Sequence, residues 1–273
     1  MSRSVCGIAG CYQQADGRKL TDVMTGRIAH RGPDAAGTWR RETRLVAMHL
    51  GHRRLSVIDL SAAADQPLVK GNLTLVYNGE LYNYRQLRAE LAGRGAVFTT
   101  NSDTEVVLEA WRRWGSAALD KFRGMFAFAL ADTASGELIL ARDPLGVKPL
   151  LYLERGDGVV FASELKALIA ALGPELRIEP GALAASMLYY WVPEQRCAIR
   201  GVRKLPAGSW LRLRPGMKPQ LTRYWRVEDV AAEAASRPAP DLRAVIEDSV
   251  RAHLAADVPV SSFLSGGLDS SIV

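Results

Sequence analysis

The sequence predicts an α+β fold built as a layered sandwich, and two observations support it. Short apolar runs typical of strands dominate the chain up to about residue 180, and they cluster instead of alternating strictly with helical segments. Strict alternation would have favoured a doubly wound parallel sheet. At 273 residues, of which 48% are hydrophobic, the chain can bury a sizeable core and is longer than one typical domain.

Each element is expected from its apolar pattern and from the turn residues beside it. The segment from Cys6 to Tyr12 is small and apolar, which predicts a short buried strand near the start of the chain. Further strands are expected at 37–41, 44–51, 73–77, 125–131, 137–142, 150–154, 159–162 and 209–214. Helices are expected at 19–29, 83–92, 104–114, 181–190 and from Glu164 onward.

Two local signals predict where elements begin and end. Asn78 and Gly79 form the commonest hairpin signal, so the strand over 73–77 is expected to end there. Ser102 precedes the helix over 104–114 and Glu105 follows three residues later, which predicts a capping box.

The character of the chain changes towards its C-terminal end. Residues 231–240 are rich in alanine and proline and indicate a linker, followed by an amphipathic helix at 241–255 and an apolar strand at 258–264. That strand enters a Ser-Gly-Gly loop and the start of a helix, a combination whose backbone N–H groups favour phosphate, although it is not the Walker pattern. One helix, one strand and one loop do not make a domain, so we expect these residues to begin a longer second domain.

Composition and charge exclude several classes of protein. The net charge is +6, but the basic residues are scattered among acidic ones without interleaved aromatic residues, which argues against nucleic-acid binding. No apolar run of about 18 residues and no secretory signal are present, so a cytoplasmic protein without a membrane span is expected. The three cysteines lack metal-ligand spacing and a disulfide pattern, and no GxSxG elbow occurs.

Cys6 is notable because it lies so close to the N-terminus. A free α-amine has a pKa of about 7.7–8.0 and can take the proton of an adjacent thiol, as in N-terminal nucleophiles. Inside a chain the same nitrogen is an amide without basicity, and residues 1–5 precede Cys6 here. Taken alone, Cys6 is therefore either a small packed side chain or a nucleophile whose preceding residues are absent.

Eight motifs occur in a defined order along the chain. They are CGI, HRGPD, RLSVID, YNGELYNY, NSDTE, GMFAFA, ARDPLGVKPL and SGGLDSS. This set resembles the glutamine-hydrolysing asparagine synthetases, over essentially Cys6 to Val273. The resemblance implies an N-terminal-nucleophile-type four-layer αββα sandwich at 6–225, a class II glutaminase domain. It further implies a linker at 226–240, and at 241–273 the first elements of a truncated α/β ATP-binding domain.

The resemblance implies a set of glutaminase roles. Cys6 would attack the side-chain amide of L-glutamine with its own α-amine as general base, and a thioester would form and be hydrolysed to glutamate. Asn78 and the Gly79 N–H would form the oxyanion hole, with Asn78 also binding glutamine. The remaining glutamine-binding residues would be Arg54 for the α-carboxylate, and Glu80 and Asp103 for the α-ammonium. The alternatives are a surface charge for Arg54 and a helix cap for Asp103.

The resemblance also implies an ATP-dependent second reaction. The pyrophosphate of ATP would lie against Leu264, Ser265, Gly266, Gly267, Asp269, Ser270 and Ser271, and Asp269 would hold Mg²⁺. ATP would adenylate a carboxylate, and ammonia channelled from the first site would displace AMP. The acceptor would be aspartate, or a sugar acid or peptide, since residues 184–200 resemble bacterial members with variable acceptors. A homodimer is possible, although the residues do not indicate it.

Two further readings compete with this one. A non-catalytic truncated homologue would be expected to lose the nucleophile, but Cys6, Arg54, Asn78 and Asp103 are all present. A glutaminase joined to a phosphoribosyl or sugar-phosphate domain would lack the SGGLDSS loop.

The sequence departs from the family at residues 1–5, because the family carries cysteine directly after the initiator methionine. A cleaved leader explains this, and so does a misassigned start, because Val5 can be encoded by GUG, a common bacterial start codon. We favour the misassigned start, which predicts Cys6 as the first residue of the natural protein.

Overall fold

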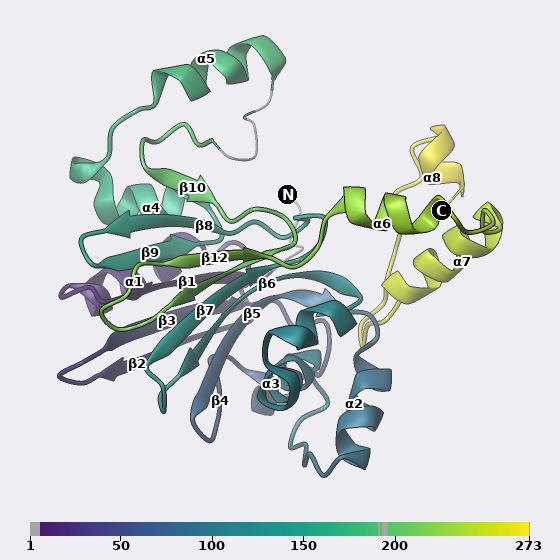
Figure 1. Cartoon of the computed structure of the whole chain (residues 1–273), viewed down its shortest axis with the longest axis horizontal. Coiled ribbons are helices and arrows are strands. Elements are labelled where there is room, and N and C mark those ends of the chain that lie inside the picture. The colour runs from purple at the N-terminus through teal and green to yellow at the C-terminus, as the bar shows by residue number, and fades with distance from the viewer. Residues whose placement is uncertain (1–5, 191, 193–195, 273) are drawn as a thin grey trace. The chain divides into compact units, whose positions relative to one another are not determined.

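The computed structural model describes residues 6–190, 192 and 196–272, and it has an α+β architecture (Figure 1). The chain forms two compact units. The first contains the chain up to Leu55, Asp65–Glu80 and Gly124–Trp225, and the second contains Ser56–Ala64, Leu81–Arg123 and the chain from Arg226. The predicted residues 1–5, whether leader or misassigned start, lie outside the described residues.

The first unit is built around two six-stranded sheets whose recorded pairings are antiparallel. The first sheet has the order β10-β8-β9-β1-β3-β2. Its strands are β1 (Gly7–Tyr12), β2 (Ala35–Glu42), β3 (Ala47–Arg54), β8 (Leu151–Arg155), β9 (Gly158–Ala162) and β10 (Val202–Lys204). The second sheet has the order β12-β11-β7-β6-β5-β4. Its strands are β4 (Leu68–Lys70), β5 (Leu73–Leu81), β6 (Gly124–Asp132), β7 (Glu137–Arg142), β11 (Ser209–Leu213) and β12 (Gln220–Arg223).

The predicted first strand is central to this arrangement. All six residues of β1 are buried, and the strand pairs with β3 on one side and β9 on the other. Because side chains alternate between faces of a strand, Ile8 joins the core between the two sheets and Ala9 joins a core on the opposite face. The predicted α+β sandwich is thus confirmed from its first strand.

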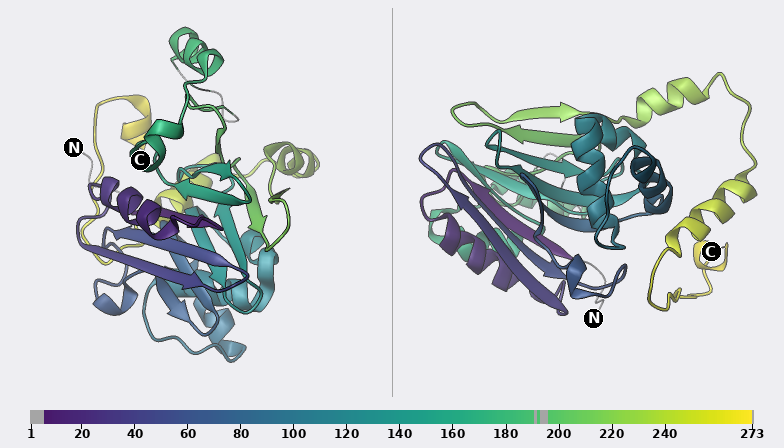
Figure 2. Two further views of the ribbon diagram at one scale, coloured as in Figure 1. Left: turned by 90° about the vertical axis from the view of Figure 1, so that its left-hand side faces the viewer. Right: turned by 90° about the horizontal axis from the view of Figure 1, so that it is seen from below.

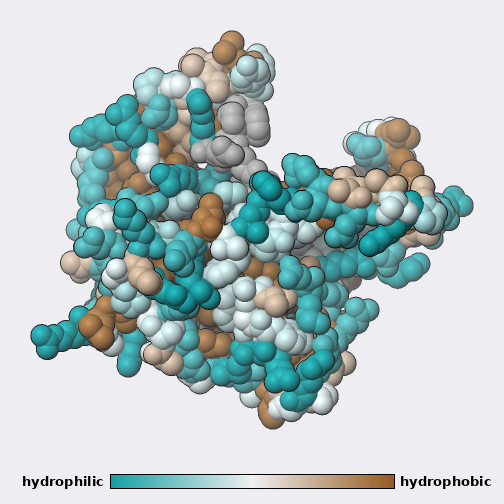
Figure 3. Space-filling model, in the orientation of Figure 1, coloured by the Kyte–Doolittle hydropathy of each residue, from teal (hydrophilic) through white to brown (hydrophobic). Residues whose placement is uncertain are grey.

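Helices cover the outer face of the first sheet. Helix α1 (Gly17–Arg27) packs against β1 and β3, and α4 (Leu165–Leu172) packs against α1 and β9 (Figure 2). Leu20 and Met24 of α1 and Leu168 of α4 fill this second core. Helix α5 (Pro180–Tyr189) is mostly exposed, and its exposed residues include Met187 and Leu188. Hydrophobic side chains are visible at the top of Figure 3, where Figure 1 places this helix.

The second unit is helical. It contains α2 (Tyr84–Gly93), α3 (Asp103–Trp114), α6 (Val227–Ala234), α7 (Leu242–His253), α8 (Leu268–Ile272) and the 3-10 turns η1 (Ala62–Ala64) and η2 (Gly115–Lys121). The first unit adds the turn η3 (Gly173–Glu175). None of the helices in the described ranges has the length and apolar character needed to cross a membrane.

The predicted capping box at α3 is half correct. Ser102 caps the helix, since its hydroxyl accepts a hydrogen bond from the Thr104 N–H at 3.1 Å. The Ser102 N–H, however, donates to the Thr100 hydroxyl, and the Glu105 carboxylate accepts from the N–H groups of Thr99 and Thr100 instead. Glu105 is fully buried, so it orders the preceding loop from inside the unit.

Two predictions for the C-terminal region differ from the structure. The predicted linker at 226–240 begins with helix α6, whose exposed residues are compatible with helix because alanine favours it. The predicted strand at 258–264 is wrong, because no strand is assigned there. A strand requires a hydrogen-bonded neighbour, and the described residues provide none for this segment.

Candidate functional site

The Asn-Gly pair lies inside a strand and not in a hairpin turn. Strand β5 continues through Asn78 and Gly79 to Leu81, and its neighbour in the sheet on this side is β6. A Cβ atom on Gly79 would lie 2.5 Å from the Met125 carbonyl oxygen and 2.8 Å from the Phe126 Cα. Glycine at 79 is therefore required by the close approach of two backbones.

Asn78 has a buried side chain whose polar atoms are unsatisfied. It is 0% exposed, and neither its oxygen nor its nitrogen forms a hydrogen bond with any residue that the structure describes. Such a group costs about 1–3 kcal/mol of stability, so it is rare unless it has a partner that comes and goes. The amide nitrogen of Asn78 is thus a donor available to a ligand.

His52 contacts Tyr77, the residue of β5 that precedes Asn78. It lies in β3, and its Nε2 is 3.0 Å from the carbonyl oxygen of Tyr77, so the contact joins the two sheets. Because only a protonated Nε2 can donate to a carbonyl, this nitrogen carries the ring hydrogen. Burial lowers the pKa of His52 to about 4, which keeps the ring neutral near pH 7.

The free energy of unfolding is therefore expected to fall as the pH drops from about 6.5 to about 4. In this window the unfolded chain binds a proton at His52 and the folded chain does not, which costs up to about 3 kcal/mol. Urea unfolding of wild type and His52→Gln across pH 4–7 measures the effect, and the slope should be smaller in the variant. His253→Gln, which removes a histidine exposed on α7, should keep the wild-type slope. Equal slopes in all three proteins would contradict the assignment.

A substitution at Gly79 tests the backbone approach of β5 to β6. Gly79→Ala is expected to lower the free energy of unfolding by about 1–3 kcal/mol, because the added Cβ has no space beside the Met125 carbonyl. Gly93→Ala is the matched control, since a Cβ at Gly93 has open space in helix α2 and should be neutral or stabilising. Thermal unfolding of both variants checks this, and a Gly79→Ala protein as stable as Gly93→Ala would refute it.

Cys6 is half-buried and held at its backbone and its thiol. Its Sγ lies 3.6 Å from the Leu55 carbonyl oxygen and accepts from the Leu55 N–H at 3.4 Å. The Arg31 Nε donates to the Cys6 carbonyl oxygen at 2.8 Å, and Arg31 Nη1 donates to Glu164 at 2.7 Å. Hydrogen bonds from Arg31, Lys166 and His30 lower the pKa of Glu164 to about 2 against the opposing effect of its burial.

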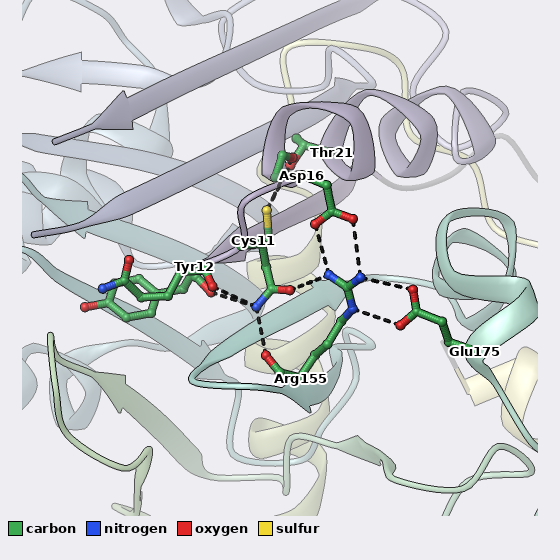
Figure 4. A network of polar contacts seen from close by, with 9 residues as sticks. Cys11, Tyr12, Asp16, Thr21, Arg155 and Glu175 are labelled. Atoms are coloured by element: carbon green, nitrogen blue, oxygen red, sulfur yellow. Dashed lines mark hydrogen bonds and ion pairs between the residues drawn. The ribbon is translucent and has the colours of Figure 1, made fainter. Parts of the chain in front are cut away.

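The other two cysteines differ from Cys6 in burial. Cys11 is buried on β1, where its Sγ lies 3.3 Å from the Gly17 carbonyl oxygen and 3.6 Å from the Thr21 hydroxyl (Figure 4). Burial raises the pKa of Cys11 to about 12, so this thiol is inert at neutral pH. Cys197 is also buried, which leaves Cys6 as the accessible thiol.

Figure 4 also shows an ion-pair network beside Cys11. Arg155 lies between Asp16 and Glu175, with N–O distances of 2.9 Å to each, and donates to the Gln14 side chain at 2.7 Å. These contacts tie β8 to the start of α1 and to η3.

Arg54 ends β3 beside the predicted nucleophile. The register pairs Gly7 with Arg53, so Arg54 is one step further along the same edge, level with Cys6. The side chain is buried, and its Nη1 lies 2.7 Å from the Asp65 carboxylate, whose side chain is 41% exposed. Burial excludes the surface-charge alternative for Arg54.

Asp103 contacts the residue that follows Glu80 in the chain. Asp103 is buried at the start of α3, and its Oδ2 accepts from the Leu81 N–H at 2.9 Å. Glu80 precedes Leu81 in β5. Ser102 is the N-cap of α3, and Asp103 is the first residue of the helix. The role of Glu80 and Asp103 towards an α-ammonium stays a prediction.

The ARDPLGVKPL motif carries two residues that sequence reasoning passed over. Asp143 is 1% exposed and accepts from four backbone N–H groups, those of Leu145, Val147, Lys148 and Phe126, at 2.9–3.2 Å. Lys148 is 6% exposed. A buried lysine is rare without a charged neighbour, and a lysine in a loop with Gly and Pro punctuation was the signal that could have identified it.

The predicted ATP loop is exposed and partly closed on itself. The Ser265 N–H donates to the Ser270 hydroxyl at 3.3 Å, and the Gly267 N–H donates to the Ser265 hydroxyl at 3.4 Å. Gly266 has a φ of +79°, which suits glycine. Asp269 is not joined by two further His, Cys, Asp or Glu residues into a metal-binding group within the described ranges. The described residues thus provide part of an anion cradle and do not by themselves complete a Mg²⁺ site.

Comparisons with known proteins agree on one group. Family models match residues 5–225 to the glutamine amidotransferase domain and residues 241–273 to asparagine synthase. Asparagine synthetase (glutamine-hydrolyzing) 1 of Bacillus subtilis is 38% identical, covering 98% of this chain and 43% of the relative. Asparagine synthetase B (glutamine-hydrolyzing) of Escherichia coli is 35% identical, covering 98% of this chain and 44% of the relative.

A solved structure is also similar. Glutamine phosphoribosylpyrophosphate amidotransferase from B. subtilis, complexed with ADP and GMP, matches with a TM-score of 0.62 over 80% of this chain and 49% of that chain. At 23% identity this likeness concerns the fold alone. The chain spans less than half of the length of the two synthetases, 43% and 44%.

Proposed function

We propose, from the premise that this chain belongs to the glutamine amidotransferase domain family, that it hydrolyses glutamine to glutamate and ammonia with Cys6 as nucleophile. One observation carries the proposal: a buried Asn78 amide without a partner in the described structure, on a strand that Gly79 brings against its neighbour. An amide held ready at a cost in stability is expected of an oxyanion hole.

The proposed reaction uses the residues of this chain in two steps. The Cys6 sulfur forms a bond to the side-chain carbonyl carbon of glutamine while its proton passes to the α-amine of Cys6. Asn78 Nδ2 and the Gly79 N–H donate to the developing oxyanion. The α-amine returns the proton to the leaving nitrogen, so ammonia departs and a thioester remains. Water then adds to the thioester, and glutamate leaves with the thiol restored.

The ends of the substrate need groups of both charges. Arg54 would bind the α-carboxylate of glutamine, since its guanidinium is buried level with Cys6. Glu80 and Asp103 would bind the α-ammonium.

The whole protein is proposed to use the ammonia for ATP-dependent amidation of aspartate to asparagine. The match of residues 241–273 to asparagine synthase and the names of the relatives support this. Leu264, Ser265, Gly266, Gly267, Asp269, Ser270 and Ser271 would contact ATP, and Asp269 would contribute to Mg²⁺ binding. A sugar acid or peptide acceptor is the alternative, and the first reaction is the same in both. Because ATP and glutamine are metabolites of the cytoplasm, we place the protein there.

Glutamate release from protein that begins at Cys6 tests the glutaminase proposal. Wild type should release glutamate, Cys6→Ala should not exceed the uncatalysed background, and Cys11→Ala, which removes a buried inert thiol, should retain activity if it folds. Equal release by wild type and Cys6→Ala would overturn the proposal in favour of a non-catalytic homologue.

The N-terminal residue of the natural protein tests the base. Mass analysis is expected to find Cys6 first. An active natural enzyme that begins at Ser2 would contradict a mechanism in which the α-amine of Cys6 accepts the proton.

A further inference from the structure

Lys148 lies at the same end of the strands of the first sheet as Cys6. Strand β9 pairs antiparallel with both β1 and β8, so these two strands run parallel to each other, and the register places Ala9, Ala162 and Leu151 in one row. Cys6 precedes Ala9 by three residues and Lys148 precedes Leu151 by three residues. Cys6 and Lys148 therefore both lie beyond the same end of the sheet, where β1 and β8 begin, and these two strands are about 10 Å apart.

The loop that carries Lys148 is rigid and joined to the Asn78 strand. Asp143 accepts from the Lys148 N–H at 3.0 Å, and Arg142 donates to the Lys148 carbonyl oxygen at 2.8 Å. The Asp143 carboxylate also accepts from the N–H of Phe126, the residue whose Cα approaches Gly79. The position of the lysine is thus fixed by the framework that also fixes the proposed oxyanion hole.

The side chain of Lys148 is surrounded by charged groups of the candidate site. Burial lowers the pKa of Lys148 and is the largest effect, and Arg31 after α1 acts in the same direction. Cys6 just before β1, Glu80 on β5 and Asp143 in its own loop favour the ammonium form. Arg54 is a further charged group near the Cys6 thiol, because it precedes Leu55, whose N–H donates to the Cys6 sulfur. Arg54 is itself paired with Asp65.

We propose that the ammonium of Lys148 acts through space on the sulfur of Cys6, stabilising the thiolate and so making Cys6 nucleophilic near neutral pH. This inference rests on the proposed role of Cys6 in glutamine hydrolysis. The thiol proton passes to the α-amine, or to water where the amine is blocked. Lys148 acts as a positioning residue that favours the thiolate and forms no bond with the substrate.

The test is the pH dependence of Cys6 alkylation by iodoacetamide, followed by mass spectrometry of the Cys6 peptide in the full chain. This readout needs no glutamine turnover, so it stays informative if the glutaminase proposal fails. In wild type the midpoint should lie below the ordinary thiol value of about 8.5. Lys148→Met should raise the midpoint by about one pH unit, because it removes an opposite charge near the thiolate.

Two controls separate charge from packing. Lys148→Arg should keep the wild-type midpoint, and Lys204→Met, which removes the same charge from β10, should also keep it. A purely structural role would change the rate of alkylation at all pH values without moving the midpoint. An unshifted midpoint in folded Lys148→Met overturns the proposal. If that variant does not fold, a wild-type midpoint at or above 8.5 overturns it.

The same proteins assayed for glutamate release show which proposal fails. A shifted alkylation midpoint without any glutaminase activity in wild type would support the electrostatic role and reject the proposed function. Normal glutaminase activity with unshifted alkylation midpoints would support the proposed function and reject the electrostatic role of Lys148.

Discussion

Asn78→Ala is expected to reduce kcat for glutamine hydrolysis about 10²–10³-fold while leaving stability unchanged or higher. The side chain is buried, and its two polar atoms bond to no residue of the described structure, so its removal breaks no internal hydrogen bond and relieves a desolvation cost. The activity falls because the oxyanion loses a preorganised donor at the moment when charge develops. Steady-state glutaminase assays and urea unfolding on the same preparation measure both effects.

The opposite signs make this prediction specific. A structural asparagine would lower stability when replaced, as expected for Asn72→Ala, because Asn72, in the turn between β4 and β5, donates from Nδ2 to Asp132 at 2.6 Å. Asn72→Ala should lose stability and keep kcat. Asn78→Leu, which keeps the branched shape and the number of side-chain heavy atoms, controls for a cavity and should be at least as stable as Asn78→Ala. An Asn78→Ala protein with wild-type kcat would exclude the side chain from the oxyanion hole.

Asp143→Ala is expected to lower the free energy of unfolding by about 3–5 kcal/mol. The carboxylate satisfies four backbone N–H groups at once and is 1% exposed, so its loss leaves several buried donors without a partner. The loop would then no longer fix Lys148 beside the candidate site. Urea unfolding at pH 7 measures the change.

Asp132→Ala is the matched control for this prediction. Asp132 accepts from the Ala134 N–H and from the side chains of Asn72 and Ser135, and it lies at the partly exposed end of β6, where water can replace these contacts. Its loss should therefore cost less, about 1 kcal/mol. Equal destabilisation by the two substitutions would show that the buried loop of Asp143 relaxes or admits water.

Local patterns predicted most elements because the residues that pack are apolar. Strand β1 and the paired strands β6 and β7 are apolar runs buried on both faces, and they lie within a few residues of their predicted bounds. Helices α1 to α4 do so as well, since apolar periodicity reports the face of a helix that packs. Failures occurred where a neighbour overrode a local signal. Asn78 and Gly79 read as a turn, but pairing with β6 holds them in a strand.

The sequence alone determined the candidate residues and their order. Cys6, Arg54, Asn78 and Gly79 were identified by residue type and motif order, because thiol, guanidinium and amide chemistry belongs to the side chain itself. Lys148 and Asp143 were missed, because their significance depends on burial and neighbours that no short stretch of sequence contains.

Only the tertiary structure decided which groups are partnered and which are free to act. It paired Arg54 with Asp65, left the Asn78 amide unsatisfied, and placed Lys148 at the sheet edge of Cys6. The physical reason is that the free energy of a polar group depends on its desolvation and partners, and both are set by strands far apart in the sequence.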